Sequence, residues 1–186
     1  MTDPITPTNT LRQVAGLLRA RNAIDDVIAA IIERPVHPGH LGEWIAAQIF
    51  DLELEQSVTT RAIDGRFRTG PLAGKTVDVK WYGKQEGMLD MTEHASPDYY
   101  LVLTGPRSAA VTSRGTTRPL TIESVYLFQA AKLAETIRAA GLKLGVATSV
   151  RRALWDTAEV YPEPTNPDLP VTDEQRHALS LFSTAT

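Results

Sequence analysis

The chain has 186 residues, no cysteine and a formal net charge of −3 at pH 7, and 42% of its residues are hydrophobic. This length and apolar content predict one sizeable core, so we expect a single domain over 1–186. The lack of cysteine excludes disulfides, thiolate metal sites and cysteine nucleophiles. Residues 1–9 are polar and contain proline, unlike a signal peptide or a membrane segment, so a cytoplasmic protein with no membrane partner is expected.

Charge is distributed unevenly along the chain. Residues 61–152 contain 14 Lys and Arg against 8 Asp and Glu, a balance of +6, whereas the two flanks together carry −9. A basic middle between acidic ends allows a local surface that attracts phosphate on an acidic protein, although ordinary solvated charge explains any one cluster equally well.

Two helices are expected in an N-terminal extension over 1–36. Asn9 can cap a helix that runs to Leu18, and Asn22 or Ala23 can begin another that ends before Pro35. The apolar residues of the second helix offer an interface for a homodimer, but core packing explains them equally well; they are Val27, Ile28, Ile31 and Ile32.

A third helix is expected over 41–50, with apolar residues nearly all round and Glu43 as its one charged residue. Burial of an unpaired carboxylate is unfavourable. Two interpretations of Glu43 stand at even odds: it lies half solvated at the helix start, or it acts near a metal or Lys80.

Strand structure is expected over 54–69, a turn over 70–74, and further strands over 77–82, 99–104, 120–128 and 142–150. A helix through 131–137 should stop at Gly141. Residues 162–186 form an acidic, proline-rich C-terminal extension, read as a surface linker over 162–170 and a short final helix around 174–182. Strands interspersed with helices predict an α/β protein.

The central motif is the run Val77-Asp78-Val79-Lys80. Side chains alternate faces along a strand, so Asp78 and Lys80 should leave one side while the two valines face the core. If Asp64 lies on the neighbouring strand of a hairpin, its carboxylate can approach that of Asp78. Two close carboxylates repel unless something such as a divalent cation neutralises them.

The order Glu43, Asp64, Asp78-Val79-Lys80 resembles that of the PD-(D/E)XK nuclease superfamily, which includes many type II restriction endonucleases. The resemblance extends over roughly 41–105. It implies a restriction-endonuclease-like core, a central mixed sheet flanked by helices, with the N-terminal helices as an addition.

The resemblance also implies a Mg²⁺-dependent endonuclease that hydrolyses phosphodiester bonds of double-stranded DNA. Catalytic residues would be Glu43, Asp64, Asp78 and Lys80. The metal, for which Mn²⁺ can substitute, would be held by Asp64, Asp78 and the carbonyl of Val79. Lys84 and Gln85 are candidate DNA contacts. The alternative, that they are simply exposed polar residues at the end of a strand, is favoured.

Two other classes remain open. A catalytically silent nucleic-acid-binding or assembly module on the same fold would keep the basic middle of the chain. In a structural or interaction protein, Asp78 and Lys80 would form a solvated strand face.

Three further motifs do not support a functional site. Gly70 to Thr76 is one residue short of a phosphate-binding loop and leads into a strand. The histidines 37, 40 and 94 lack metal-site spacing, and no nucleophile elbow is present.

Overall fold

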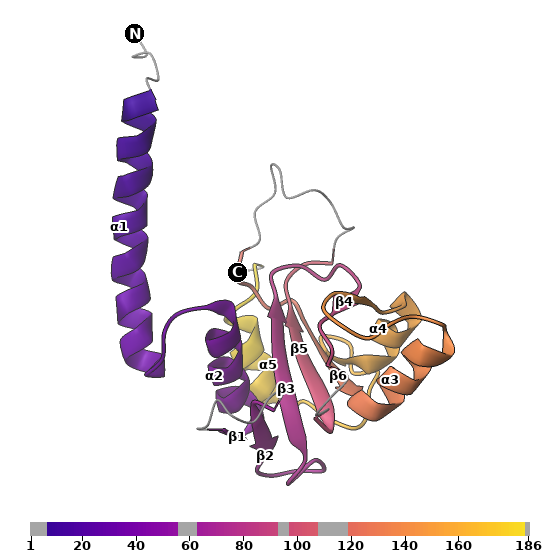
Figure 1. The fold of residues 1–186 in the computed structure, drawn as a ribbon. Coiled ribbons are helices and arrows are strands. Elements are labelled where there is room, and N and C mark those ends of the chain that lie inside the picture. The colour runs from indigo at the N-terminus through magenta and orange to yellow at the C-terminus, as the bar shows by residue number, and fades with distance from the viewer. Residues whose placement is uncertain (1–6, 56–62, 93–96, 108–118, 185–186) are drawn as a thin grey trace. The chain divides into compact units, whose positions relative to one another are not determined.

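The computed structural model describes residues 7–55, 63–92, 97–107 and 119–184. The chain divides into two compact units, Met1–Leu41 and Gly42–Thr186, and each is treated by itself. Figure 1 shows the elements in chain order.

The first unit is dominated by one continuous helix, α1 (Pro7–Ile32). The expectation of two helices was wrong, because the residues around the expected break, Ala20 to Ala23, include no proline or glycine and contain good helix formers. Arg21 and Asp25, one turn apart, form an ion pair of 3.4 Å across this region. Proline suits the first helical position, and Glu33 with φ of 57° follows the helix end.

The second unit contains a six-stranded mixed sheet in the order β1-β2-β3-β5-β6-β8. The strands are β1 (Leu52–Leu54), β2 (Gly65–Phe67), β3 (Thr76–Tyr82), β5 (Tyr99–Thr104), β6 (Ser124–Gln129) and β8 (Glu159–Tyr161). Only β3 and β5 pair in parallel; every other neighbouring pair is antiparallel. The expected α/β class with a mixed central sheet is therefore confirmed.

Residues 70–74 form the turn between β2 and β3, as predicted. Gly70 and Gly74 have φ of 75° and 81°, values that glycine adopts at little cost. Gly65, at the start of β2, opposes Leu54 of β1 and Val77 of β3. Asp64 therefore stands at the beginning of the strand beside β3, which is the hairpin placement that the sequence predicted.

The parallel register of β3 and β5 is fixed at their starts by Asp98. Its carboxylate Oδ2 accepts hydrogen bonds from the backbone N–H and the hydroxyl of Thr76, at 2.8 and 2.9 Å. The Thr76 N–H is the main reason that the pKa of Asp98 is lowered. With the starts tied together, Asp78 lies opposite Tyr100 and Lys80 opposite Val102.

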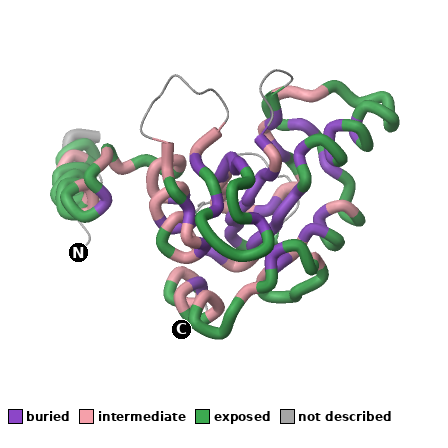
Figure 2. Tube along the Cα trace, turned by 90° about the horizontal axis from the view of Figure 1, so that it is seen from below, coloured by how far each residue is buried: buried purple, intermediate pink, exposed green. Residues whose placement is uncertain are grey.

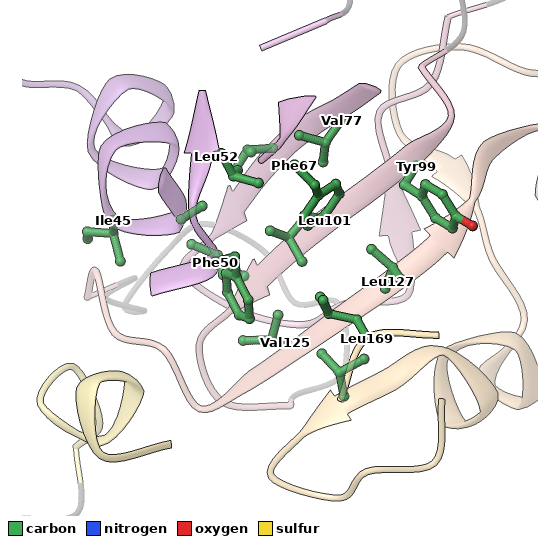
Figure 3. Close-up of a cluster of buried hydrophobic side chains, with 14 of the residues drawn as sticks. Ile45, Phe50, Leu52, Phe67, Val77, Tyr99, Leu101, Val125, Leu127 and Leu169 are labelled. Atoms are coloured by element: carbon green, nitrogen blue, oxygen red, sulfur yellow. The ribbon is translucent and has the colours of Figure 1, made fainter. Parts of the chain in front are cut away.

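Helices cover both faces of the sheet. One buried cluster joins strand residues such as Val79 and Leu101 to α2 (Pro38–Phe50) and α5 (Asp173–Ser180), and Figure 3 shows part of it. The second cluster joins the opposite face to α3 (Ala130–Ala139) and α4 (Arg152–Ala158). Figure 2 shows the resulting buried interior of the sheet.

Three elements of the second unit were not predicted: α4, β8 and the two-residue β4 (Met88–Leu89). Trp155 anchors α4: it is 1% exposed, and its ring meets Tyr126 and Phe128 edge-on with centroids 4.8 and 4.9 Å apart. The strand expected over 142–150 was mostly wrong. Only β7 (Thr148–Ser149) forms there, and it pairs with β4 (Met88–Leu89) in a separate two-stranded sheet.

The C-terminal segment packs more closely than a surface linker would. Leu169 is 8% exposed and joins the first core cluster, as does the fully buried Leu179 of α5. Thr172 and Gln175 form a capping box at the start of α5. The Gln175 side chain also donates to the Ile49 carbonyl at 2.8 Å, which ties α5 to α2.

Candidate functional site

The site lies at the start of β2, where Asp64 precedes the strand and β3 extends beyond it. Asp64 donates its backbone N–H to the Val77 carbonyl at 2.9 Å, and its side-chain Oδ2 accepts the backbone N–H of Val79 at 2.7 Å. The carboxylate thus takes the place that a further residue of β2 would fill. Since the N–H and C=O of one strand residue point to the same neighbour, the Val79 carbonyl is also directed to this edge.

Asp78 and Lys80 leave the same face of β3, as the alternation of side chains predicted. Lys80 Nζ lies 2.6 Å from Asp78 Oδ1. Asp78 is 1% exposed, whereas the Lys80 side chain is 28% exposed. The carboxylate of this ion pair is therefore buried, whereas its ammonium partner is partly exposed to solvent.

Burial makes both carboxylates reluctant to ionise. The pKa of Asp64 is raised from 3.8 to about 7, first by burial and then by the charge of Asp78, against the opposing effect of the Val79 N–H. Burial also raises the pKa of Asp78, although the ion pair with Lys80 works against it. These are the conditions under which a cation between two carboxylates is favourable.

Lys80 remains a cation at neutral pH. Burial lowers its pKa, but the ion pair with Asp78 and the nearby Asp64 outweigh burial, so the pKa is raised overall. The group is therefore suited to stabilise negative charge and not to accept a proton.

Glu43 comes from α2, which approaches β3 closely. A Cβ on Gly42 would lie 3.0 Å from the Cβ of Trp81, so glycine at this position permits the close packing of helix against strand. Glu43 is half-buried, and its charge contributes to the raised pKa of both Asp64 and Asp78. The structure thus brings all four predicted acidic and basic residues into one electrostatically linked group.

Sequence reasoning missed Tyr100 as a member of this group. Tyr100 lies opposite Asp78 in the parallel pair and is fully buried. Burial raises the pKa of its hydroxyl, and the charge of Asp78 raises it further. Alternation along 99–104 could have selected the correct face, but the register that pairs Tyr100 with Asp78 depends on Thr76 and Asp98, whose contact is not evident from the sequence.

Tyr82 and Asp90 connect the end of β3 to the neighbouring small sheet. The Tyr82 hydroxyl accepts the Asp90 N–H at 2.9 Å, and the Asp90 carboxylate accepts the N–H of Ala147 at 2.7 Å. Burial raises the pKa of Tyr82, so its hydroxyl stays protonated.

The two candidate DNA contacts differ in accessibility. Lys84 is half-buried, whereas Gln85 is 7% exposed and its backbone N–H donates to the Pro106 carbonyl, so Gln85 offers little surface to a ligand. A third cation, not selected from sequence, is Arg151. It is exposed and follows Val150, whose N–H donates to the Gly87 carbonyl at 2.9 Å, so Arg151 lies beside the turn that follows Lys84.

Asp64, Asp78 and the Val79 carbonyl offer hard oxygen donors, the type that Mg²⁺ prefers. Among the residues that the structure describes, no group of three or more His, Asp and Glu side chains is arranged to hold a metal.

Of the three histidines considered in the sequence, His94 lies outside the described residues. His37 and His40 have local roles: the His37 Nδ1 accepts the His40 N–H at 3.4 Å, and the His40 Nδ1 lies 2.9 Å from the Pro35 carbonyl.

No protein-family model matches the sequence, and no curated protein matches it. Within the described ranges, none of the helices is both long and apolar enough to cross a membrane.

Proposed function

We propose that the protein is a metal-dependent phosphodiesterase that cleaves DNA, with its active site at Asp64, Asp78 and Lys80. One observation carries the proposal: the Asp64 carboxylate accepts the Val79 N–H directly beside the buried ion pair of Asp78 and Lys80. Two carboxylates with raised pKa and one protonated lysine are thereby gathered where the β2–β3 pairing ends. The sequence resemblance to PD-(D/E)XK nucleases supports the same assignment.

The chain's own groups have distinct roles in this proposal. Asp64, Asp78 and the Val79 carbonyl would hold Mg²⁺, and Glu43 adds negative charge nearby. A bound Mg²⁺ supplies a Lewis acid for a phosphate oxygen and lowers the pKa of a coordinated water. Lys80, whose raised pKa keeps it charged, stabilises the negative charge that develops on the phosphoryl oxygens.

DNA is the favoured substrate because the exposed Arg151 and the half-buried Lys84 lie near the end of β3 that carries Lys80. Arg151 lies beside the turn that follows Lys84, and both belong to the basic segment 61–152. Cations next to a carboxylate site suit a polyanion whose backbone must reach that site.

The experiment compares cleavage of plasmid, linear duplex and single-stranded DNA with Mg²⁺, Mn²⁺ or a chelator. Wild-type protein should cut with either metal and not with chelator. Asp78→Asn and Lys80→Ala should each lose at least about 100-fold in rate. Asp168→Asn, which removes an exposed carboxylate elsewhere, is the matched control and should retain activity.

Metal binding separates the two inactive variants. Lys80→Ala should still bind Mn²⁺ because lysine is not a ligand, whereas Asp78→Asn should bind it poorly. Glu43→Gln should have a smaller effect than either. Cleavage by Asp78→Asn at the wild-type rate, or no cleavage by wild-type protein with either metal, would rule the site out.

A catalytically silent DNA-binding module is the second candidate. It is favoured by the 2.6 Å ion pair, in which Lys80 already neutralises Asp78 without a cation. Salt-sensitive DNA binding by wild-type protein that never cleaves and never binds Mn²⁺ would select this alternative.

A further inference from the structure

An apolar face of α1 lacks any cover within the first unit. Seven large apolar side chains along it are 47% to 70% exposed: Leu11, Val14, Leu17, Leu18, Ile24, Val27 and Ile31. At 3.6 residues per turn they occupy about half of the helix circumference, with Leu11, Val14 and Leu18 along one edge of this half and the other four along the adjoining edge. A helix in water gains most of its stability from packing such a face, and over 7–41, the part of the first unit that the structure describes, there is no second long element to provide that packing.

The charges of α1 are segregated along its length. Its charged residues before position 24 are all arginines, at 12, 19 and 21, and those after it are Asp25 and Asp26, with Glu33 just beyond the helix end. Arg21 and Asp25, where the two halves meet, form an ion pair of 3.4 Å. One half of the helix is therefore positive and the other half negative.

The helix dipole adds to this asymmetry. The first turn of α1 contains no acidic residue and the last turn no basic residue, so neither end of the dipole is compensated by the helix's own side chains. An antiparallel neighbour would place the opposite dipole end beside each of them.

We propose that α1 pairs in antiparallel orientation with α1 of a second copy of this chain. The apolar face would be buried against its own equivalent, and the arginine half of each helix would lie beside the aspartate half of the other. A parallel pair would instead place arginines beside arginines and aspartates beside aspartates. The second copy is the occupant chosen because charge complementarity is present within the helix itself.

The first test measures the mass of the full chain by sedimentation equilibrium over the micromolar range. Wild-type protein should have about twice the 20.4 kDa of one chain. Leu17→Glu combined with Ile24→Glu places charge on the apolar face and should raise the dissociation constant of the dimer at least about 100-fold. Ala23→Glu combined with Ala30→Glu introduces the same charges on the opposite, exposed face and should leave the dimer intact.

The second test determines orientation, and the lack of cysteine makes it direct. Single spin labels are attached after Arg12→Cys, Asn22→Cys or Ala30→Cys, and the distance between the labels of the two copies is measured. In an antiparallel pair the Asn22→Cys labels lie closest, and the labels near the ends lie roughly 20 Å or more apart, because the helix rises about 1.5 Å per residue. A parallel pair gives the same short distance at all three positions.

Four outcomes would overturn the proposal. A monomer throughout the concentration range would show that α1 is not paired, and binding of that monomer to anionic vesicles would identify a lipid surface as the occupant. Dimers that survive Leu17→Glu with Ile24→Glu would place the interface elsewhere, and equal distances at the three labels would reverse the orientation. The unfolding midpoint of the second unit, monitored by tryptophan fluorescence, serves as the folding control because all three tryptophans lie there.

Discussion

Asp64, the residue before β2, accepts the Val79 N–H with its side chain at 2.7 Å, so a side chain replaces the backbone partner that β3 would otherwise have. This position places its carboxylate near Asp78, whose charge is the second cause, after burial, of a pKa of about 7 for Asp64. The hydrogen bond that orders the carboxylate thus holds it where ionisation is unfavourable without a cation.

We expect Asp64→Asn to stabilise the metal-free protein at pH 8 by about 2 kcal/mol, since a pKa unit corresponds to about 1.4 kcal/mol and partial exposure reduces the effect. The folded pKa of about 7 lies above the ordinary 3.8, so the folded state retains the proton longer. Wild-type stability therefore falls as pH rises from 3.8 to about 7. The advantage of the variant should vanish below this window and level off above it, as measured by urea unfolding at several pH values.

Calcium provides the control for this prediction. At pH 8, Ca²⁺ should raise the unfolding midpoint of wild-type protein and have little effect on Asp64→Asn, because the variant lacks a ligand charge. A stability difference that is independent of pH would contradict the assigned pKa, whereas a missing Ca²⁺ effect would contradict only the metal site.

The pair of Asp78 and Lys80 should show strong coupling in a double-mutant cycle. Lys80→Met leaves a nearly fully buried carboxylate without its counter-charge and should reduce the free energy of unfolding by about 3 kcal/mol. Asp78→Asn should reduce the free energy of unfolding by less, because the Lys80 ammonium group can turn toward water. The double variant should be more stable than additivity predicts by at least about 1 kcal/mol.

The exposed pair of Arg152 and Asp156 is the matched comparison for that cycle. Its atoms lie 3.5 Å apart and its side chains are 78% and 48% exposed. The cycle of Arg152→Met with Asp156→Asn should give a coupling below about 0.5 kcal/mol. Equal coupling in the two pairs would mean that burial does not strengthen the interaction of Asp78 with Lys80.

Much of this site could be predicted from sequence because its parts are local. Alternation placed Asp78 and Lys80 on one face, and the glycines of 70–74 indicated the turn that brings Asp64 alongside β3. The helix over 131–137 and its end at Gly141, with φ of 74°, were equally evident. These features depend on periodicity and turn chemistry within a few residues.

The rest depends on contacts between distant segments. The three-residue β8 exists because it pairs with β6, and the seven-residue α4 is held by Trp155 against Tyr126 and Phe128. Such short elements have too little periodicity to be recognised alone. The placement of Tyr100 beside Asp78 likewise requires the register set by Thr76 and Asp98.

Gly65 should be more sensitive to substitution than its small size suggests. A Cβ there would lie 2.6 Å from the Glu53 carbonyl oxygen, a backbone atom of β1 that cannot easily move. Gly65→Ala should therefore cost about 3 kcal/mol in unfolding free energy and displace the adjacent Asp64. Gly70→Ala is the control: φ is 75° but no atom lies within 4 Å, so only the backbone cost of about 1 kcal/mol is expected. Equal losses would show that steric contact with β1 is unimportant.

DNA affinity should depend on Arg151 more than on Lys75. Arg151 lies beside the turn that follows β3, whereas Lys75 precedes β3 at its opposite end, where it pairs with Asp98 at 3.3 Å. If Arg151 neutralises a phosphate, Arg151→Ala should lower the magnitude of the slope of log K against log salt by about 0.9, since each neutralised phosphate contributes about that amount. Lys75→Ala should leave the slope unchanged.

The measurement is fluorescence anisotropy of a labelled duplex in Ca²⁺, which should occupy the proposed metal site without supporting the cleavage expected with Mg²⁺. Binding should weaken steeply with salt for wild-type protein and less steeply for Arg151→Ala, because one fewer counterion is released. Equal slopes of log K against log salt for Arg151→Ala and Lys75→Ala would show that Arg151 does not contact a DNA phosphate. An absence of binding at low salt would argue against both the nuclease and the silent DNA-binding alternative, since each requires contact with the phosphate backbone.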